Sequence, residues 1–279
     1  MLRSLCSWSS LAYLAFACSA WAQYLDIEEV AVSDYEGGLG LPASFEFTAG
    51  QKVYLSFRIA GMGQADAKAA LRYEVNYVDC EGRQVIPTMA ANLRRTMSGR
   101  PWNPVVRGAV EIPSAPRSGT HSFRIAVTDE VTKQTVYTSV PFEVRSDFED
   151  PAETLSIVRF RFFRSDYSDT PLPVRPEFQR GNEIWGRFYL TGFRLNEKNE
   201  YNLQYGVSLR DTLGRIIFNE PAAASETKSF FYAKTHVPGV INVSLERSIK
   251  PGAYLLVISA SDVIGNQKTA AEFPFRVGE

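Results

Sequence analysis

"LRYEVNYVDCEGR" (residues 71–83) is the stretch that decides the fold, and "LQYGVSLRDTLGR" (203–215) repeats its pattern further along the chain. Apolar residues take every second position of each copy, and in the first copy they are Leu71, Tyr73, Val75 and Tyr77. A period of two places these side chains on one face of a strand. Each copy then ends in Asp-x-x-Gly, which a type I turn prefers. The two stretches therefore predict half-buried β-strands that run into tight turns.

The similarity between the two halves extends well beyond this strand. "GQKVYLSFRIAG" (50–61) aligns with "GNEIWGRFYLTG" (181–192), and "SGTHSFRIAVTD" (118–129) aligns with "PGAYLLVISASD" (251–262). The offset between the halves drifts by only two residues, which is typical of a duplicated domain with small changes in its loops. We therefore expect one domain over residues 25–146, a linker over 147–151 and a second domain over 152–279.

Each copy contains about seven short segments with strand character. In the second copy they cover 155–163, 183–191, 201–210, 215–219, 240–246, 253–261 and 268–277. Aromatic residues make up 13% of the chain, which favours β-structure, and no stretch has a convincing helical period. Seven alternating segments separated by turn residues predict an all-β protein of two tandem seven-stranded β-sandwiches.

The stretch "PGAYLLVI" (251–258) resembles the corner before the sixth strand of immunoglobulin-like and fibronectin type III-like modules. The resemblance covers both halves at the level of the fold. It implies that the hydroxyl of Tyr254 bonds to backbone a few residues upstream. The cysteine pair of antibody domains is absent, so the resemblance does not extend to that subclass.

Residues 1–22 have the pattern of a signal peptide. Arg3 precedes a short apolar run, and Ala20-Trp21-Ala22 matches a signal-peptidase site. Cleavage there leaves Cys80 as the single cysteine of the mature chain, so an internal disulfide is excluded. We expect export to the periplasm or the extracellular space. Lipid attachment at Cys18 is a minor alternative, because Ala15 stands where a lipobox prefers a larger aliphatic residue.

Charge and motif content argue against several classes of partner. Thirty Lys and Arg balance 31 Asp and Glu, so there is no basic excess for nucleic acid, and no apolar run of the mature chain is long enough to span a membrane. The two histidines, His121 and His236, lack the spacing of a zinc site. We expect no cofactor and no metal. The acidic linker residues Asp147, Glu149 and Asp150 are better read as a solvated connector than as a calcium site.

Cys80 and His121 raise the question of a catalytic pair, and the internal repeat argues against it. Asp79 and Gly82 recur as Asp211 and Gly214, whereas Thr212 replaces Cys80, so the turn requires the Asp and the Gly but not the thiol. Position 121 aligns with Tyr254, another ring with a polar tip. We therefore expect both residues to serve the structure.

Long loops on rigid sandwiches often carry binding residues. The longest predicted loop covers residues 88–108, and its candidate contacts are Arg94, Arg95, Arg100 and Trp102. Arg and Trp are enriched at binding hot spots, although Trp102 between two prolines also suits a lid over its own core. In the second copy the equivalent loop carries three aromatic residues, and with His121 these are expected to lie at the domain junction: Phe230, Phe231 and Tyr232.

A second candidate surface is "RFRFFR" (159–164), which neighbours Trp185, Arg187 and Tyr189. The apolar parity changes between Ile157 and Phe160, which predicts a β-bulge or a strand that changes sheets.

These observations favour an exported, non-catalytic binding, adhesion or envelope-assembly protein whose partner is an unknown protein or glycan of the cell envelope. A periplasmic chaperone or accessory subunit is the alternative, although its client-binding strand would have to be "TVYTSVPFEV" (135–144), which alternates only in part. A metal-dependent carbohydrate-active enzyme, with a site built from scattered acids such as Asp129 and Asp166, is the remote alternative.

Overall fold

The computed structural model describes residues 24–63, 68–97 and 101–279, and the predicted signal peptide lies outside these ranges. The described residues form sixteen β-strands and no helix. The first eight strands are β1 (Asp26–Ser33), β2 (Glu46–Thr48), β3 (Lys52–Ala60), β4 (Lys68–Val78), β5 (Met89–Thr96), β6 (Val105–Glu111), β7 (Gly119–Asp129) and β8 (Thr135–Arg145). The second eight are β9 (Ser156–Phe163), β10 (Glu177–Phe178), β11 (Glu183–Thr191), β12 (Glu200–Asp211), β13 (Ile216–Ser229), β14 (His236–Ser244), β15 (Gly252–Asp262) and β16 (Gln267–Val277).

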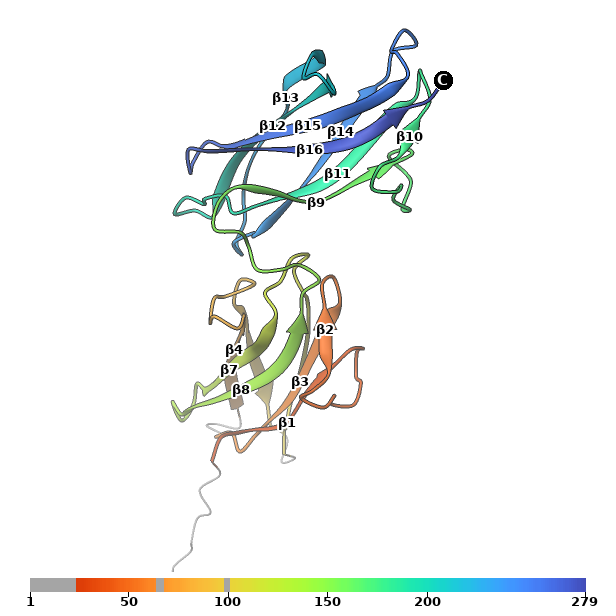
Figure 1. Ribbon diagram of the computed structural model, residues 1–279. Helices are drawn as coiled ribbons and strands as arrows, with labels where there is room; N and C mark the ends of the chain where they lie inside the picture. Colours follow the sequence, from red (N-terminus) through yellow and green to blue (C-terminus); the bar gives the residue numbers. More distant parts are fainter. Residues whose placement is uncertain (1–23, 64–67, 98–100) are drawn as a thin grey trace, which may run out of the picture.

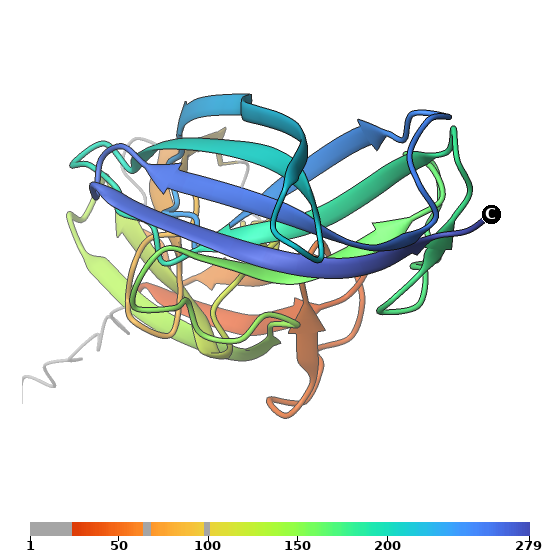
Figure 2. The same cartoon turned by 45° about the horizontal axis from the view of Figure 1, so that its top comes forward.

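The strands form four sheets, two in each half of the chain. In the first half a three-stranded sheet of order β1-β3-β6 faces a five-stranded sheet of order β2-β8-β7-β4-β5. The second half has the same arrangement: a three-stranded sheet of order β9-β11-β14 and a five-stranded sheet of order β10-β16-β15-β12-β13. We call these halves the first and the second sandwich; they lie end to end (Figure 1), and the second shows its five-stranded sheet with β13 at one edge (Figure 2). The all-β tandem fold predicted from the sequence is confirmed.

Each sandwich has one strand more than the seven predicted. The additional strands, β2 and β10, are three and two residues long and pair in parallel with the last strand of their own sandwich. They were missed because so short a segment shows no periodicity.

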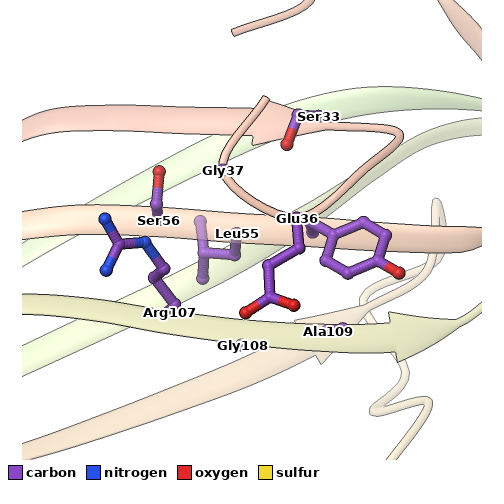
Figure 3. Close-up of a pocket in the computed structure, with 9 residues that line it drawn as sticks. Ser33, Glu36, Gly37, Leu55, Ser56, Arg107, Gly108 and Ala109 are labelled. Atoms are coloured by element: carbon purple, nitrogen blue, oxygen red, sulfur yellow. The ribbon is translucent and has the colours of Figure 1, made fainter. Parts of the chain in front are cut away.

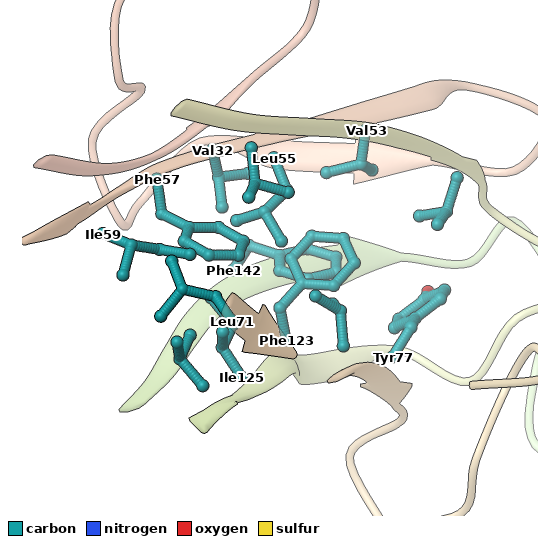
Figure 4. Packing of buried hydrophobic residues seen from close by; sticks show 14 of the residues in the cluster. Val32, Val53, Leu55, Phe57, Ile59, Leu71, Tyr77, Phe123, Ile125 and Phe142 are labelled. Carbon is teal, nitrogen blue, oxygen red and sulfur yellow. The ribbon is translucent and has the colours of Figure 1, made fainter. Parts of the chain in front are cut away.

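The alternating side chains of each sandwich meet in a single core. Phe57 and Leu55 of β3 lie opposite Phe123 of β7 and Phe142 of β8 in the first sandwich (Figure 4). Phe123 and Phe142 contact each other with ring centroids 5.0 Å apart. The second sandwich builds a separate core around Phe162, Phe188 and Phe275. Burial of these large side chains is the main force that holds each pair of sheets together.

Bulges interrupt the first strand of both sandwiches. The pairing of β9 with β11 shifts between Val158 and Arg161, and Arg159 adopts a positive φ of 56°. This is the bulge that the change of parity in "RFRFFR" predicted. β1 has its counterpart at Glu29, where φ is 50°. Shared irregularities of this kind are consistent with a common origin of the two halves.

We call the Asp-x-x-Gly turns at residues 79–82 and 211–214 the C–C′ turns, and the strands that follow them differ from the sequence prediction. Most of the predicted loop 88–108 is strand, because β5 pairs with β4 from Met89 to Thr96 and β6 begins at Val105. In the second sandwich, β13 continues to Ser229 and β14 begins at His236 rather than near residue 240. Both β5 and β13 are edge strands with mostly exposed side chains. Alternation is limited to Met89, Ala91 and Leu93 in β5 and is weak in β13, so β5 was not recognised from the sequence and β13 was recognised only over 215–219.

Candidate binding surfaces

His121 is buried and has no free ring nitrogen for Cys80. Its Nε2 lies 2.9 Å from the carbonyl oxygen of Arg117, and its Nδ1 lies 2.8 Å from the hydroxyl of Tyr77. Because a carbonyl oxygen only accepts, the proton is on Nε2, and Nδ1 accepts from Tyr77. Burial lowers the pKa of His121 below its ordinary value, which favours this neutral ring.

Cys80 is exposed as a residue, but partial desolvation of its thiol, together with the charges of Asp79 and Glu81, raises its pKa. A catalytic cysteine needs the opposite, a lowered pKa and a nearby base. The two residues therefore do not form a nucleophile–base pair in this structure.

Tyr254 and His121 perform the same task in the two sandwiches. The hydroxyl of Tyr254 donates to the carbonyl oxygen of Lys250 at 2.7 Å, four residues upstream, as His121 does to Arg117. This is the bond that the resemblance to immunoglobulin-like corners implied. His121 lies near the start of β7 and Tyr254 near the start of β15, and each ring bonds back to the turn that precedes its strand.

The C–C′ turns also repeat. Oδ1 of Asp79 accepts from the backbone N–H groups of Glu81 and Arg83, and Oδ1 of Asp211 accepts from those of Leu213 and Arg215. Gly82 and Gly214 end the turns with φ of 78° and 80°. A residue with a side chain would be strained at this φ, which explains why the glycine recurs and the cysteine does not.

Among the three aromatic residues of the predicted junction, Tyr232 makes the contact between the sandwiches. Its hydroxyl donates to Oδ2 of Asp79 at 2.9 Å, and its ring packs against the core of the first sandwich. Phe230 instead stacks on Tyr201 within the second sandwich, and Phe231 is 52% exposed. His121 is buried, with an exposure of 0%, and its two ring nitrogens bond to Tyr77 and Arg117 of the first sandwich.

The connection between the sandwiches is itself packed on the second one. Phe148 lies with its ring 4.8 Å from that of Tyr189 and 4.5 Å from that of His236, and the Arg159 guanidinium lies 4.6 Å above it. The linker is therefore held on the second sandwich by an aromatic side chain, and Arg159 also donates to the carbonyl oxygen of Asp147.

The predicted distal contacts divide into exposed and half-buried residues. Arg94 and Arg95 are exposed on the edge strand β5. Trp102 is half-buried, packs against the first core, and has the Arg95 guanidinium 5.9 Å from its ring centroid. Arg100 lies outside the described residues. The packing of Trp102 fits the lid role that the sequence left open, and its binding role stays a prediction.

Several acids that a catalytic reading would use have structural partners. Oδ1 of Asp129 accepts from the N–H groups of Val131 and Thr132, and Oδ2 accepts from Gly63. Asp262 repeats this arrangement in the second sandwich. Within the described ranges, no cluster of three or more His, Cys, Asp or Glu side chains is placed to hold a metal ion.

A small pocket of about 170 Å³ lies on the outer face of the three-stranded sheet of the first sandwich. Figure 3 shows Glu36 and Arg107 on either side of Leu55. The loop after β1 forms one wall, and β6 forms the other. The pocket is too small to enclose a ligand of more than a few heavy atoms.

A larger hollow of about 440 Å³ lies in the second sandwich, where β13 leaves the C–C′ turn. Its inner wall consists of core side chains: Leu209, Leu245, Ile249 and Tyr254. Its rim carries the first three residues of β13, Ile216, Ile217 and Phe218, which are 59%, 50% and 40% exposed. We call these three residues, with Leu213 at 80% exposure, the apolar rim.

The counterpart of Ile217 in the first sandwich is not exposed. The residue aligned with Ile217 is Val85, which is only 4% exposed and belongs to the first core. Val85 donates its N–H to the carbonyl oxygen of Tyr77, whereas the aligned Leu209 pairs with Phe218 and leaves Ile217 as an extra residue in a bulge. The bulge therefore places the Ile217 side chain away from the core, whereas the aligned Val85 side chain is buried in it.

The exposure of the apolar rim was not predicted from the sequence. "RIIF" (215–218) reads as an ordinary short strand, and the prediction placed one at 215–219. The signal that was available is the repeat: Gln84 and Glu81 are polar where Ile216 and Leu213 are apolar. This gain of apolar residues at exposed positions distinguishes the second copy from the first.

No family model matches the chain, and no curated protein matches it. Among solved structures, the Pseudomonas fluorescens alkylpurine DNA glycosylase AlkC is similar at 19% identity and a TM-score of 0.29, over 44% of this chain and 30% of that one. A family 123 glycoside hydrolase from Clostridium perfringens is similar at 16% identity and 0.31, over 45% and 27%. The C-terminal domain of the Streptococcus agalactiae AgI/II polypeptide BspA is similar at 8% identity and 0.31, over 91% and 100%. This chain spans less than a third of the first two chains, and at such TM-scores none of the three informs its function.

In the part of the chain that the structure describes, no helix has the length and apolar character needed to cross a membrane.

Proposed function

We propose that the chain is an exported, non-catalytic binding protein of two immunoglobulin-like domains, which presents the apolar rim of the second sandwich to a protein of the cell envelope. The observation that carries this proposal is the contrast between Val85, which is buried at 4%, and Ile217, which is exposed at 50%. Isolated apolar residues on a surface are ordinary, but three of them lining a hollow of about 440 Å³, with Leu213 exposed in the turn before them, form a surface that a partner can cover.

The chemistry of the rim favours a protein partner over a glycan. The four residues of the apolar rim offer only apolar side chains. Polar and charged residues line the hollow beside them: Asp211, Arg215, Ser244, Glu246, Ser248 and Lys250. Apolar contact surrounded by charged residues such as Arg215 and Lys250 is typical of protein interfaces.

The edge of β13 is poorly suited to the strand addition that a chaperone would use. The pairing of β12 with β13 is interrupted twice, beside Ile217 and again opposite Gly206, and Pro221 lies in the second interruption. Bulges and proline at an edge prevent continuous pairing with another strand. Binding through side chains that enter the hollow is the mode that this edge supports.

The test is capture from an envelope fraction with the wild-type protein and an Ile217→Asp/Phe218→Ser variant. We expect a partner to come down with the wild type and to be lost from the variant, while both proteins keep the same melting temperature. A matched variant, Arg94→Ala/Arg95→Ala/Trp102→Ala, addresses the predicted distal surface and should retain the partner. Equal capture by wild type and rim variant, or no capture by either, would overturn the proposal.

A further inference from the structure

In each sandwich the C–C′ turn lies at one end. In the first sandwich this end is in contact with the second sandwich. There the C–C′ turn meets the loop between β13 and β14 of the second sandwich, where Tyr232 bonds to Oδ2 of Asp79 and packs on the first core. The corresponding end of the second sandwich carries Asp211, the apolar rim and the hollow, and it is the free end of the described chain (Figure 1).

The acceptor that Tyr232 uses has a counterpart at the free end. In both turns Oδ1 of the aspartate is used by two backbone N–H groups. In the first sandwich Oδ2 takes the hydroxyl of Tyr232. In the second, Oδ2 of Asp211 accepts from Nε of Arg215 at 2.6 Å, and that arginine side chain is 75% exposed. The Asp211 side chain is only 13% exposed, but the arginine lies on the solvent side of it, so a donor from a partner can take the place of the arginine.

The two sandwiches also differ in the space beside the aspartate: at the free end there is room for an aromatic ring. Val85 closes this region of the first sandwich, so Tyr232 rests on the surface of its core. At the free end Ile217 is lifted away, and the hollow reaches Leu245 and Ile249 of the second core. A tyrosine ring therefore finds an apolar wall on one side and a carboxylate within reach of its hydroxyl on the other.

The loop that occupies the first sandwich is held rigid by its own contacts. The N–H of Phe230 donates to the carbonyl oxygen of Asn199, and the side-chain amide of Asn199 donates to the carbonyl oxygen of Phe231 at 3.0 Å. Lys234 lies 4.4 Å from the ring of Phe230. A tyrosine presented on such a loop loses little conformational entropy on binding.

From these equivalences we infer that the hollow of the second sandwich receives a tyrosine-tipped loop of another β-sandwich domain, in the way that the first sandwich receives Tyr232. The inference rests on the proposed function and names the chemistry of its partner: an aromatic ring for the hollow and a hydroxyl for Asp211. The apolar rim then packs against the flanks of the incoming loop.

The probe is a cyclic peptide of sequence KSFFYAKT, residues 228–235, which reproduces the loop that the first sandwich binds. Binding to the whole protein is measured by fluorescence anisotropy, and methyl NMR shifts of Ile217 and Ile249 locate the site. We expect binding that weakens roughly three- to tenfold when the peptide tyrosine is replaced by phenylalanine, since one hydrogen bond is lost.

Two aspartate variants locate the acceptor. Asp211→Asn keeps the Oδ1 acceptor of the turn but removes the carboxylate, and it should weaken binding of the tyrosine peptide while leaving that of the phenylalanine peptide unchanged. Asp79→Asn is the matched control and should have no effect, because its site is already occupied by Tyr232. Ile217→Asp should abolish binding of both peptides.

Several results would overturn the inference. Three of them concern the tyrosine peptide: it fails to bind, it binds the Ile217→Asp variant as well as the wild type, or it binds no better than the phenylalanine peptide. The fourth is peptide binding that is weakened by Asp79→Asn and not by Asp211→Asn. Self-association that depends on Ile217 but is not displaced by the peptide would also overturn it, since another face of a second copy would then be the occupant. If the rim variant loses an envelope partner and the peptide does not bind, the proposed function stands and only this inference fails.

Discussion

At the scale of single residues, two side chains that a functional reading would single out are explained by hydrogen bonds. His121 is placed between Tyr77 and the backbone of Arg117, and Asp79 is placed at the head of its turn. The repeat allowed the sequence alone to predict structural roles for both. It did not reveal that Asp79 also accepts from Tyr232, because a contact between residues 153 positions apart leaves no local pattern.

The buried neutral His121 predicts a dependence of stability on pH. Burial lowers its pKa, while the hydrogen bond to the Arg117 backbone and the charges of Asp79 and Glu143 oppose this shift only in part. In the unfolded chain the ring takes up a proton near its ordinary pKa of about 6.5. As the pH falls below that value the unfolded state gains a proton that the folded state does not bind, so the free energy of unfolding falls by up to about 1.4 kcal/mol per pH unit.

We expect His121→Tyr, which installs the residue of the second sandwich, to flatten this dependence between pH 7 and 5.5. Urea denaturation at several pH values measures it. His236, whose pKa is also lowered by burial, should supply the remaining slope. A variant with an unchanged slope would show that His121 is protonated in the folded protein.

At the scale of elements, strands with one buried face were predictable and the edge strands were not. β3, β7, β11 and β15 alternate buried with partly buried or exposed side chains over most of their length, and this period is visible in the sequence. β5 and β13 pair along one edge only and expose most of their side chains. Their place in the sheet is decided by backbone pairing with β4 and β12, which no periodicity reports.

The different registers of Val85 and Ile217 predict opposite responses to the same substitution. Val85→Ala removes two buried methyl groups and leaves a cavity, so we expect it to lower the free energy of unfolding by about 2 kcal/mol. Ile217→Ala removes a side chain that is half exposed, and we expect a cost of less than about 1 kcal/mol.

Chemical denaturation of the two variants beside the wild type makes the comparison. If Ile217→Ala costs as much as Val85→Ala, the side chain belongs to the core and the apolar rim is not a binding surface.

At the scale of the whole molecule, the contact of Tyr232 with Asp79 couples the two sandwiches. Tyr232→Phe leaves Oδ2 of Asp79 without this donor, and we expect it to cost about 1–2 kcal/mol. The loss should fall on the first sandwich, because Phe230 and the rest of the loop pack within the second.

Differential scanning calorimetry should therefore show two separated transitions in the variant, with the lower one assigned to the first sandwich. Phe231→Ala is the control, since that ring is 52% exposed and only its backbone takes part in the loop. Identical thermograms for Tyr232→Phe and the wild type would show that the sandwiches unfold independently.

The short strands β2 and β10 have a consequence for mechanical load. Each pairs in parallel with the last strand of its own sandwich, as in Phe47 with Val144 and Phe178 with Val277. A tension that draws the two ends of the described chain apart pulls the partners of each pair in opposite directions along their length. Their hydrogen bonds are then sheared together rather than unzipped one after another. Two- and three-residue elements that add little to equilibrium stability thus form parallel pairs that an extending force has to shear.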